Sequence, residues 1–268
     1  MTSTLKFLFV GDIVGQNGLD IFLKWLPIIK NKYSIDSIIV NGENSAKNGK
    51  GITAKIAEQL KSAEVDIITS GNHIWENREI YDYLNKSDFL LRPANFPADC
   101  PGKGYAIYQV KNNFVAVMNL QGRVFMRENL DCPFRKAESL LTLLKTKTNI
   151  ILVDFHAEAS SEKLALGNYL DGKISLFCGT HTHIQTADEK ILPNGTAYIT
   201  DLGFCGAHNS IIGMEKDSII TKFITQLPTK FKPEANPPFE INGIWTEIDT
   251  VSGRAISIER IKILDNMQ

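Results

Sequence analysis

The hydrophobic positions of the chain fall into short β-branched runs that alternate with stretches of helical periodicity. The first runs predict strands near residues 4–10, 37–40 and 65–69, and each precedes a helical pattern, near residues 19–32, 53–63 and 76–85. Pro27 stands inside the first helical pattern and is expected to kink or divide that helix, because proline lacks the amide hydrogen that the helix needs. Strands that alternate with helices indicate a layered α/β domain with both sheet faces covered.

The second half of the chain adds further strands. A β-hairpin is predicted at residues 105–110 and 114–120, and a helix near residues 134–144. Later strands are predicted near residues 149–154, 174–178 and 196–200, with a final pair inside 239–264. Residues 228–238 predict an irregular connection. No linker or repeat divides the sequence, so we expect one domain over residues 1–268.

Composition narrows the class of protein. Hydrophobic residues make up 43% and charged residues 22%, which is typical of a globular protein. The apolar runs are too short to cross a bilayer and the first residues do not resemble a signal peptide, so we expect a cytoplasmic protein with no membrane contact. The net charge of −1 lacks the basic excess of a non-specific nucleic-acid clamp. Four scattered cysteines contain no CxxC pair and are expected to be reduced.

Polar side chains that can bind metals stand at the ends of the predicted strands: Asp12, Glu43, Asn44, Asn72, His73, His156, His181 and His183. In open α/β sheets ligands bind where the carboxyl ends of strands converge. Each residue alone is more typical of a cap, a turn or a structural histidine, but together they predict one site. Oxygen and imidazole donors without thiolate suit manganese, iron or zinc.

The number of donors exceeds what one ion needs. A carboxylate such as Glu43 can bridge two ions about 3.5–4 Å apart, as in two-metal hydrolytic sites. His181 and His183 are two positions apart, so in an extended segment both would face one side and reach neighbouring ions. The residues therefore predict a metal centre that holds two ions.

Five motifs that contain these residues resemble, in their order, the calcineurin-like metallophosphoesterases: Gly11-Asp12, residues 41–44 (NGEN), residues 71–73 (GNH), the strand end at His156, and residues 179–183 (GTHTH). The chain is similar to the bacterial YmdB-type branch of these enzymes, which hydrolyses 2′,3′-cyclic nucleotides. Further similarity lies in residues 92–95, 122–125, 154–163 and 185–189. The resemblance covers nearly the whole chain and implies an αββα sandwich with the metal site at the carboxyl ends of the strands.

The resemblance also implies roles for individual residues. One metal would be held by Asp12, Glu43, Asn44 and His183, and the other by Glu43, Asn72, His156 and His181. His73 would be the catalytic acid beside the leaving group. The implied cofactors are two divalent or trivalent transition-metal ions, iron or manganese, with zinc as the alternative. The implied substrate is a cyclic nucleotide or another phosphoester; RNA is a further candidate partner, and a homo-oligomer is expected.

Two places depart from the wider pattern. The superfamily usually opens with DxH, whereas position 14 here is valine, as is normal in the YmdB-type branch, where Asn44 is expected to compensate. Residues 204–207 stand where that branch usually has a Met-x-Gly-Pro turn. His208, which follows them, is interpreted as a surface or pocket-rim residue.

Other enzyme classes fit the sequence less well. It contains neither a GxSxG nucleophile elbow nor a phosphate-binding P-loop motif. A metal-dependent amidohydrolase barrel also uses an HxH pair, but after its first strand, whereas here the pair lies at position 181. The two-metal site predicts a phosphodiesterase, and the resemblance implies that it prefers 2′,3′-cyclic nucleotides. A phosphatase, or an RNA-processing or regulatory protein on the same fold, stays open.

Overall fold

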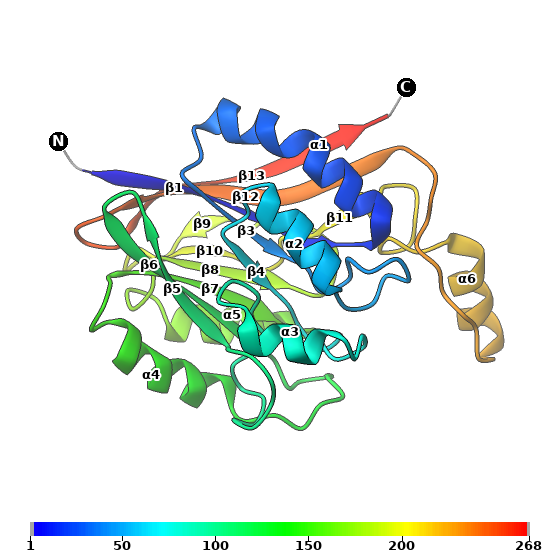
Figure 1. Cartoon of the computed structure of the whole chain (residues 1–268), viewed down its shortest axis with the longest axis horizontal. Coiled ribbons are helices and arrows are strands. Elements are labelled where there is room, and N and C mark those ends of the chain that lie inside the picture. Colours follow the sequence, from blue (N-terminus) through cyan, green and yellow to red (C-terminus); the bar gives the residue numbers. More distant parts are fainter. Residues whose placement is uncertain (1–2, 267–268) are drawn as a thin grey trace.

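Two β-sheets face each other and carry helices on their outer faces in the computed structural model, which describes residues 3–266 (Figure 1). The first sheet has the order β2-β11-β12-β1-β3-β4, with β13 paired to β12. Its strands are β1 (Thr4–Val10), β2 (Asp12–Ile13), β3 (Ser37–Asn41), β4 (Ile67–Thr69), β11 (Phe204–Ala207), β12 (Phe239–Asp249) and β13 (Ala255–Asp265).

The second sheet has the order β5-β6-β7-β8-β10-β9. Its strands are β5 (Tyr105–Val110), β6 (Asn113–Gln121), β7 (Ile150–His156), β8 (Leu176–Thr180), β9 (Lys190–Ile191) and β10 (Ala197–Ile199). Neighbours β6, β7, β8 and β10 run parallel, as do β1, β3 and β4 in the first sheet. Parallel strands bring their carboxyl ends to one edge, which is where the candidate site lies.

Six helices are described: α1 (Gly15–Tyr33), α2 (Ala54–Ser62), α3 (Ile80–Lys86), α4 (Pro133–Leu144), α5 (Ser160–Tyr169) and α6 (Lys216–Thr225). The first three share a hydrophobic cluster with the outer face of the first sheet, and α4 and α5 pack on the second sheet. The remaining helix, α6, stands at one side of the molecule (Figure 1). Among the described residues, no helix has the length and apolar composition needed to cross a membrane.

The alternation of side chains along the strands creates the layers. On β1, Phe7 and Phe9 point between the sheets, whereas Leu8 and Val10 belong to the cluster under α1 and α2. Residues of β7 alternate in the same way between the inter-sheet core and the cluster under α4 and α5. Both sheets are therefore covered on both faces, and the expected αββα sandwich is confirmed.

Most predicted elements are found, with shifted ends. The hairpin, the helix at α4, the final strand pair and the irregular segment 228–238 are confirmed. Helix α3 begins at Ile80 because residues 71–79 form turns instead, and α5, α6 and the short strands β2 and β9 were not predicted. The four cysteines are free thiols, as expected.

One prediction about local structure was wrong in part, and one segment left unassigned from the sequence is a strand. The first helix is not divided at Pro27; α1 runs unbroken from Gly15 to Tyr33, because the buried Leu26 and Ile29 on either side of the proline pack into the core. Residues 204–207, which stand where the family branch usually has a Met-x-Gly-Pro turn, form strand β11, since they pair with both β2 and β12.

Asp154 joins the two sheets at their carboxyl edge. Its carboxylate is fully buried on β7 and accepts hydrogen bonds from Asn41 at the end of β3 and from Thr69 at the end of β4. On the second sheet, Thr180 at the end of β8 donates to the other carboxylate oxygen at 2.7 Å. One acidic side chain therefore ties three neighbouring strand ends together.

We expect Asp154→Ala to lower the free energy of unfolding by about 3 kcal/mol, because buried donors lose their acceptor. Urea denaturation of the variant checks this, with Asp20→Ala on the exposed face of α1 as the control. A loss below about 1 kcal/mol, the size of one ordinary hydrogen bond, would show that the sheets do not depend on this carboxylate.

Candidate active site

The predicted donors gather into two groups at the strand ends. In the first donor group, His183 Nε2 lies 3.3 Å from Asn44 Oδ1 and 3.8 Å from Asp12 Oδ1. Asp12 begins β2, Asn44 lies in the loop after β3, and His183 lies in the loop after β8. Segments far apart in the sequence thus supply one imidazole, one amide oxygen and one carboxylate to the same point.

The second donor group is centred on His156 at the end of β7. His156 Nε2 lies 3.2 Å from Asn72 Oδ1, 3.5 Å from Glu43 Oε1 and 3.0 Å from His181 Nδ1. The two groups are adjacent, because Asp12 Oδ1 also lies 3.8 Å from His156 Nδ1. The structure therefore brings all seven predicted ligand residues together, while their role as ligands stays a prediction.

The other two histidines lie outside these groups. The ring of His73 faces Glu76, with Nδ1 3.2 Å from Oε1, and its side chain is 26% exposed. Its backbone amide donates to Glu43 Oε1 at 2.6 Å, so the residue still lies at the rim of the site. His208 is half-exposed and bound to Glu240 at 2.9 Å, which agrees with a surface residue.

A relay of hydrogen bonds fixes the orientation of His156. Thr180 donates its hydroxyl proton to Asp154, so its oxygen is free to accept from His156 Nδ1 at 3.0 Å. These partners place the ring proton on Nδ1. The lone pair of Nε2 then points into the second donor group, which is how partners of metal-bound histidines set the ligating nitrogen.

The ring orientations of His181 and His183 are also fixed by partners that lie outside the two donor groups. His183 Nδ1 donates to the carbonyl of Ile212 at 2.9 Å, and His181 Nε2 lies 3.2 Å from a carboxylate oxygen of Glu158. The opposite ring nitrogens are thereby left unprotonated and face the two donor groups. Each imidazole presents a lone pair, not a proton, to the site.

The carboxylates of the site are almost completely buried, with Asp12 0% and Glu43 1% exposed. Desolvation, followed by repulsion from Asp201, raises the pKa of Asp12 to about 8. Desolvation also raises the pKa of Glu43 well above its ordinary value, although backbone amides of His73 and Gly71 donate to it. Within residues 3–266, Asp12 Oδ1 has no hydrogen-bond partner. A buried carboxylate oxygen without a partner is costly unless a cation neutralises it.

The imidazoles complement this arrangement. Desolvation holds the pKa of His156 well below its ordinary value and lowers that of His181 to about 3, so both rings are neutral at pH 7. Neutral imidazoles, amide oxygens and carboxylates are the donor set of manganese, iron and zinc sites. Each donor group includes an asparagine oxygen. In the described part of the chain, no group of three or more His, Cys, Asp or Glu side chains is by itself arranged to hold a metal ion. The residues present fit a metal ion.

Two glycines of the motifs are required by close approach. A Cβ atom on Gly71 would lie 2.0 Å from Cδ2 of His156, and one on Gly179 would lie 1.8 Å from the carbonyl oxygen of Thr200. Any side chain at Gly71 would displace the central imidazole of the second donor group. The glycine that precedes Asn72 is therefore part of the site's architecture.

The loop after β8 is not extended, so the expectation that His181 and His183 share one face is wrong. Both residues have positive φ, 99° and 63°, a conformation that non-glycine residues rarely adopt. Thr182 between them is anchored because its amide and hydroxyl donate to Asp201 Oδ2 at 3.2 and 2.8 Å. Lys163 Nζ contacts the same oxygen at 2.6 Å. The two histidines consequently diverge into different donor groups.

Sequence reasoning missed these supporting residues. Asp154 carried a signal, because it is the one charged residue inside the apolar run 150–155. Lys163 ends the family-like stretch 154–163, but its local pattern did not indicate burial: it lies in a helix without a clear apolar face, and its complete burial follows from its partner Asp201.

The comparisons with known proteins agree with the geometry. The family model described as "YmdB-like protein" matches residues 8–261. A Bacillus subtilis protein named 2′,3′-cyclic-nucleotide 2′-phosphodiesterase is 47% identical over 262 residues, which cover 98% of each chain.

Solved structures show the same architecture. A structure described as a novel phosphatase from Mycoplasma pneumoniae has a TM-score of 0.93 and 34% identity, and the match covers 99% of this chain and 95% of that one. A putative 5′-nucleotidase from Staphylococcus aureus, at 17% identity and a TM-score of 0.63, shares the fold over 99% of this chain and 55% of its own. The sandwich is thus of the metallophosphoesterase type.

We expect Lys163→Met to lower the free energy of unfolding by about 3–5 kcal/mol, because it leaves the Asp201 carboxylate buried without its counter-charge. Adding Asp201→Asn should recover part of the loss, since the amide keeps an acceptor and removes the charge. Urea denaturation of the single and double variants measures both effects.

Lys30→Ala, which breaks an ion pair with the exposed Glu64, is the matched control and should leave the unfolding midpoint nearly unchanged. Equal losses for Lys163→Met and the control would contradict a structural role for the buried pair.

Proposed function

The chain belongs to the YmdB-like protein family, and we propose that it is a metal-dependent phosphodiesterase that hydrolyses cyclic nucleotides, with a preference for 2′,3′-cyclic ones. The observation that carries this proposal is the pair of adjacent donor groups around the unpartnered, buried Asp12 oxygen. The preference for the 2′,3′-cyclic isomer draws its support from the name of the Bacillus subtilis relative.

Each donor group would hold one ion, with iron or manganese as the proposed metals and zinc as the alternative. Glu43 lies in the second group, and its carboxylate also binds the amides of Gly71 and His73. Two bound cations supply Lewis acidity, which lowers the pKa of an attacking water and neutralises charge on the phosphoryl oxygens. The chain's own part is to hold the lone pairs and carboxylates inward.

His73 is the proposed proton donor. It follows Asn72 in the turn after β4, so its ring is carried to the rim while Asn72 faces the second donor group. Glu76 accepts a hydrogen bond from Nδ1 and favours the protonated ring. In that cation Nε2 also carries a proton, which it would give to the departing ribose oxygen. Hydrolysis breaks one phosphorus–oxygen ester bond and leaves a phosphomonoester.

The cytoplasmic location and the homo-oligomer expected from the sequence stay predictions. A phosphatase on the same site is the alternative, because the similar Mycoplasma pneumoniae structure carries that description.

The substrate class is tested by turnover of metal-reconstituted protein. We expect 2′,3′-cyclic nucleotides to be hydrolysed with a higher kcat/KM than 3′,5′-cyclic nucleotides or simple phosphomonoesters. Comparable values for both cyclic isomers would remove the preference, and turnover of phosphomonoesters alone would favour the phosphatase.

The metal content is tested by elemental analysis after reconstitution. We expect two ions per chain, and Glu43→Ala should lose more metal than Asn44→Ala. The reason is that Glu43 supplies a carboxylate and also anchors the turn that carries Asn72, whereas Asn44 supplies one amide oxygen to the first group. At most one ion in the wild-type protein would contradict the two-metal proposal.

The role of His73 is tested by His73→Ala. We expect this variant to keep its metals and its fold, while turnover of cyclic nucleotides falls by about 10²–10⁴. For a nitrophenyl ester the loss should be smaller, because nitrophenolate departs without a proton. If the variant loses metal, His73 is a ligand or a brace; if both losses are equal, it is not the acid.

A further inference from the structure

A cleft of about 560 Å³ opens between the loop after β3 and the segment that follows α6, and its lining includes Lys47, Lys230 and Lys232. None of these three lysines forms an ion pair with another residue in the described range 3–266. Glu215 adds one carboxylate to the lining, so three positive charges face one negative charge. The whole chain has a net charge of −1, yet three lysines without an ion-pair partner among the described residues line this one cleft.

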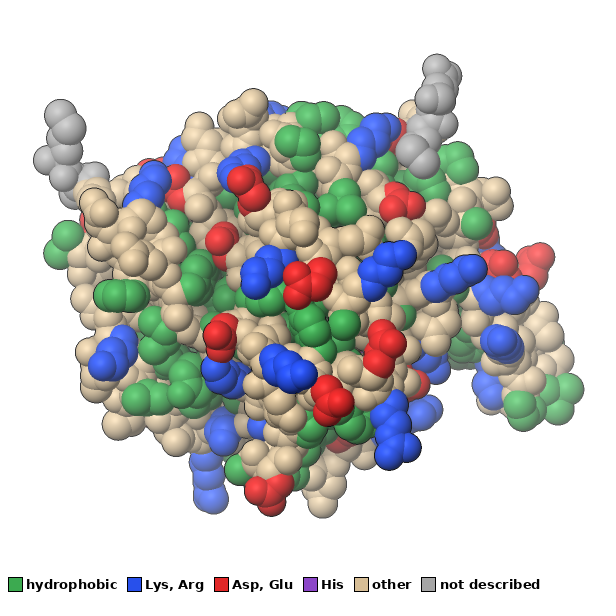
Figure 2. All heavy atoms as spheres, viewed as in Figure 1, with side chains coloured by type: hydrophobic (Ala, Val, Ile, Leu, Met, Phe, Trp, Pro, Cys, Tyr) green, Lys and Arg blue, Asp and Glu red, His purple; other side chains and the backbone are tan. Residues whose placement is uncertain are grey.

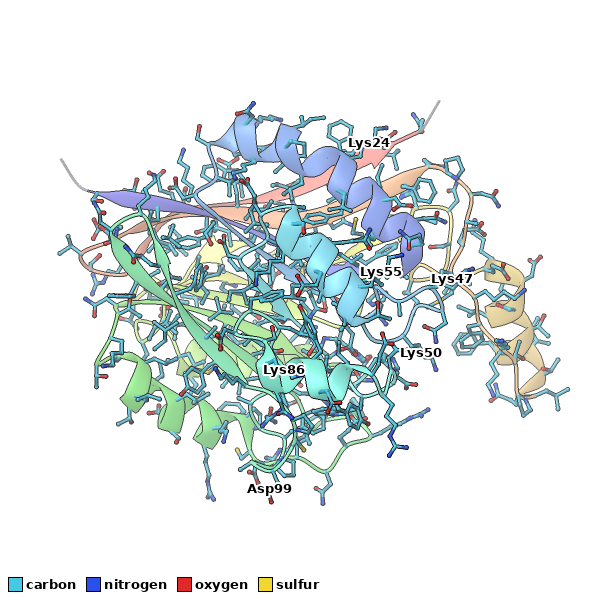
Figure 3. All side chains as sticks on the ribbon, in the orientation of Figure 1. Lys24, Lys47, Lys50, Lys55, Lys86 and Asp99 are labelled. Atoms are coloured by element: carbon cyan, nitrogen blue, oxygen red, sulfur yellow. The ribbon has the colours of Figure 1, made fainter. Side chains whose placement is uncertain are left out.

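Figures 2 and 3 show the side of the molecule on which this cleft lies. Lys47 and Lys50 project between α2 and α6 (Figure 3), and Lys and Arg side chains gather on the same side in the space-filling view (Figure 2). Phe231 lies between the two lysines of the segment, and 37% of it is exposed. Asn48 and Asn77 add amide groups to the lining.

Each wall of the cleft is connected to a residue of the candidate active site by a hydrogen bond or by a few residues of chain. On one side, Asn44 donates to the carbonyl of Gly49 at 2.9 Å, which fixes the loop that carries Lys47. On another, Asn77 lies four residues after His73 and donates to the carbonyls of Lys50 and Ile52. The cleft lining therefore includes Ala46, two residues after Asn44, and Asn77, four residues after His73.

The third wall is tied to His183. The carbonyl of Ile212 accepts from His183 Nδ1, and the residues that follow pair with the cleft segment: Glu215 N donates to Lys232 O at 2.9 Å, and Glu234 N donates to Gly213 O at 2.9 Å. The segment that carries Lys230 and Lys232 is therefore connected through residues 212–215 to a histidine of the first donor group.

We propose that this cleft binds the upstream nucleotides of a single-stranded RNA whose terminal 2′,3′-cyclic phosphate lies at the donor groups. The proposal rests on the proposed phosphodiesterase function and extends its substrate from a mononucleotide to an RNA end. Proteins bind single strands with basic side chains that contact successive phosphates and with exposed aromatic rings that stack on the bases. A mononucleotide has one phosphate, which would occupy the donor groups. An RNA strand has one additional phosphate for each upstream nucleotide, and the cleft lysines could bind these.

The chemistry at the terminus is the same hydrolysis. Water adds to phosphorus, one phosphorus–oxygen bond of the cyclic ester breaks, and the proton goes to the released ribose oxygen. A strand of DNA lacks the 2′-hydroxyl needed to form a 2′,3′-cyclic end, so RNA is the nucleic acid that fits.

The test compares 2′,3′-cyclic AMP with a fluorescent hexaadenylate that ends in a 2′,3′-cyclic phosphate. The triple variant Lys47→Gln/Lys230→Gln/Lys232→Gln should lower kcat/KM for the hexamer at least tenfold and leave cyclic AMP within twofold. The slope of log affinity against log salt should fall by about 2, because each phosphate contact on a single strand contributes about 0.7. Phe231→Ala should weaken hexamer binding about tenfold through lost stacking, while Phe231→Tyr should retain it.

The matched control is Lys86→Gln/Lys145→Gln/Lys147→Gln, which removes the same charge from exposed lysines outside the cleft lining and should change neither substrate. Equal losses for both substrates, equal losses in the control, or no loss for the hexamer would overturn the proposal. Equal displacement of the hexamer by polyglutamate, with no effect of Phe231→Ala, would instead make the cleft an acidic-peptide site.

Failure of the proposed function can be told apart from failure of this inference. If the wild-type protein hydrolyses neither substrate, the phosphodiesterase proposal fails. Fluorescence anisotropy with a hexaadenylate that ends in a 3′-phosphate then decides the inference: binding that depends on the three cleft lysines upholds an RNA cleft, and binding that does not overturns it.

Discussion

The carboxylate of Asp154 is the constraint on which the site depends. It joins the ends of β3 and β4 in one sheet to the end of β8 in the other, and through Thr180 it sets the proton on His156. Without this tie, the apolar core between the sheets would be left to set the positions of these strand ends. With it, donors separated by more than a hundred residues in the sequence converge within hydrogen-bond distance, as the 3.3 Å contact of Asn44 with His183 shows.

The carboxylates of the site are buried, and their burial determines what the site can bind. Desolvation raises the pKa values of Asp12 to about 8 and of Asp154 to about 7, and it raises that of Glu43 well above its ordinary range. Three carboxylates packed among neutral imidazoles are unfavourable unless cations neutralise them. The fold therefore holds, at its carboxyl edge, buried carboxylates whose charge the proposed metal ions would neutralise. Lys163 offsets part of the same negative charge from the far side, through Asp201.

The sequence predicted the fold and the donors well because both leave local signals. Alternating apolar runs marked the strands, and the residues directly after those runs included all seven members of the two donor groups. What stayed hidden depends on contacts distant in sequence. Lys163 is buried because of Asp201, Pro27 is tolerated because its neighbours are packed, and β11 is a strand because β2 and β12 flank it. The positive φ angles of His181 and His183 follow from the anchoring of Thr182, which no pattern of residue types indicated.

The central claim is that the two donor groups hold two metal ions side by side. Anomalous X-ray diffraction from crystals of the manganese- or iron-reconstituted protein, recorded at the absorption edge of the metal, tests it most directly. The account predicts two peaks, one bordered by Asp12, Asn44 and His183 and the other by Glu43, Asn72, His156 and His181. A single peak, or peaks away from these residues, would contradict it.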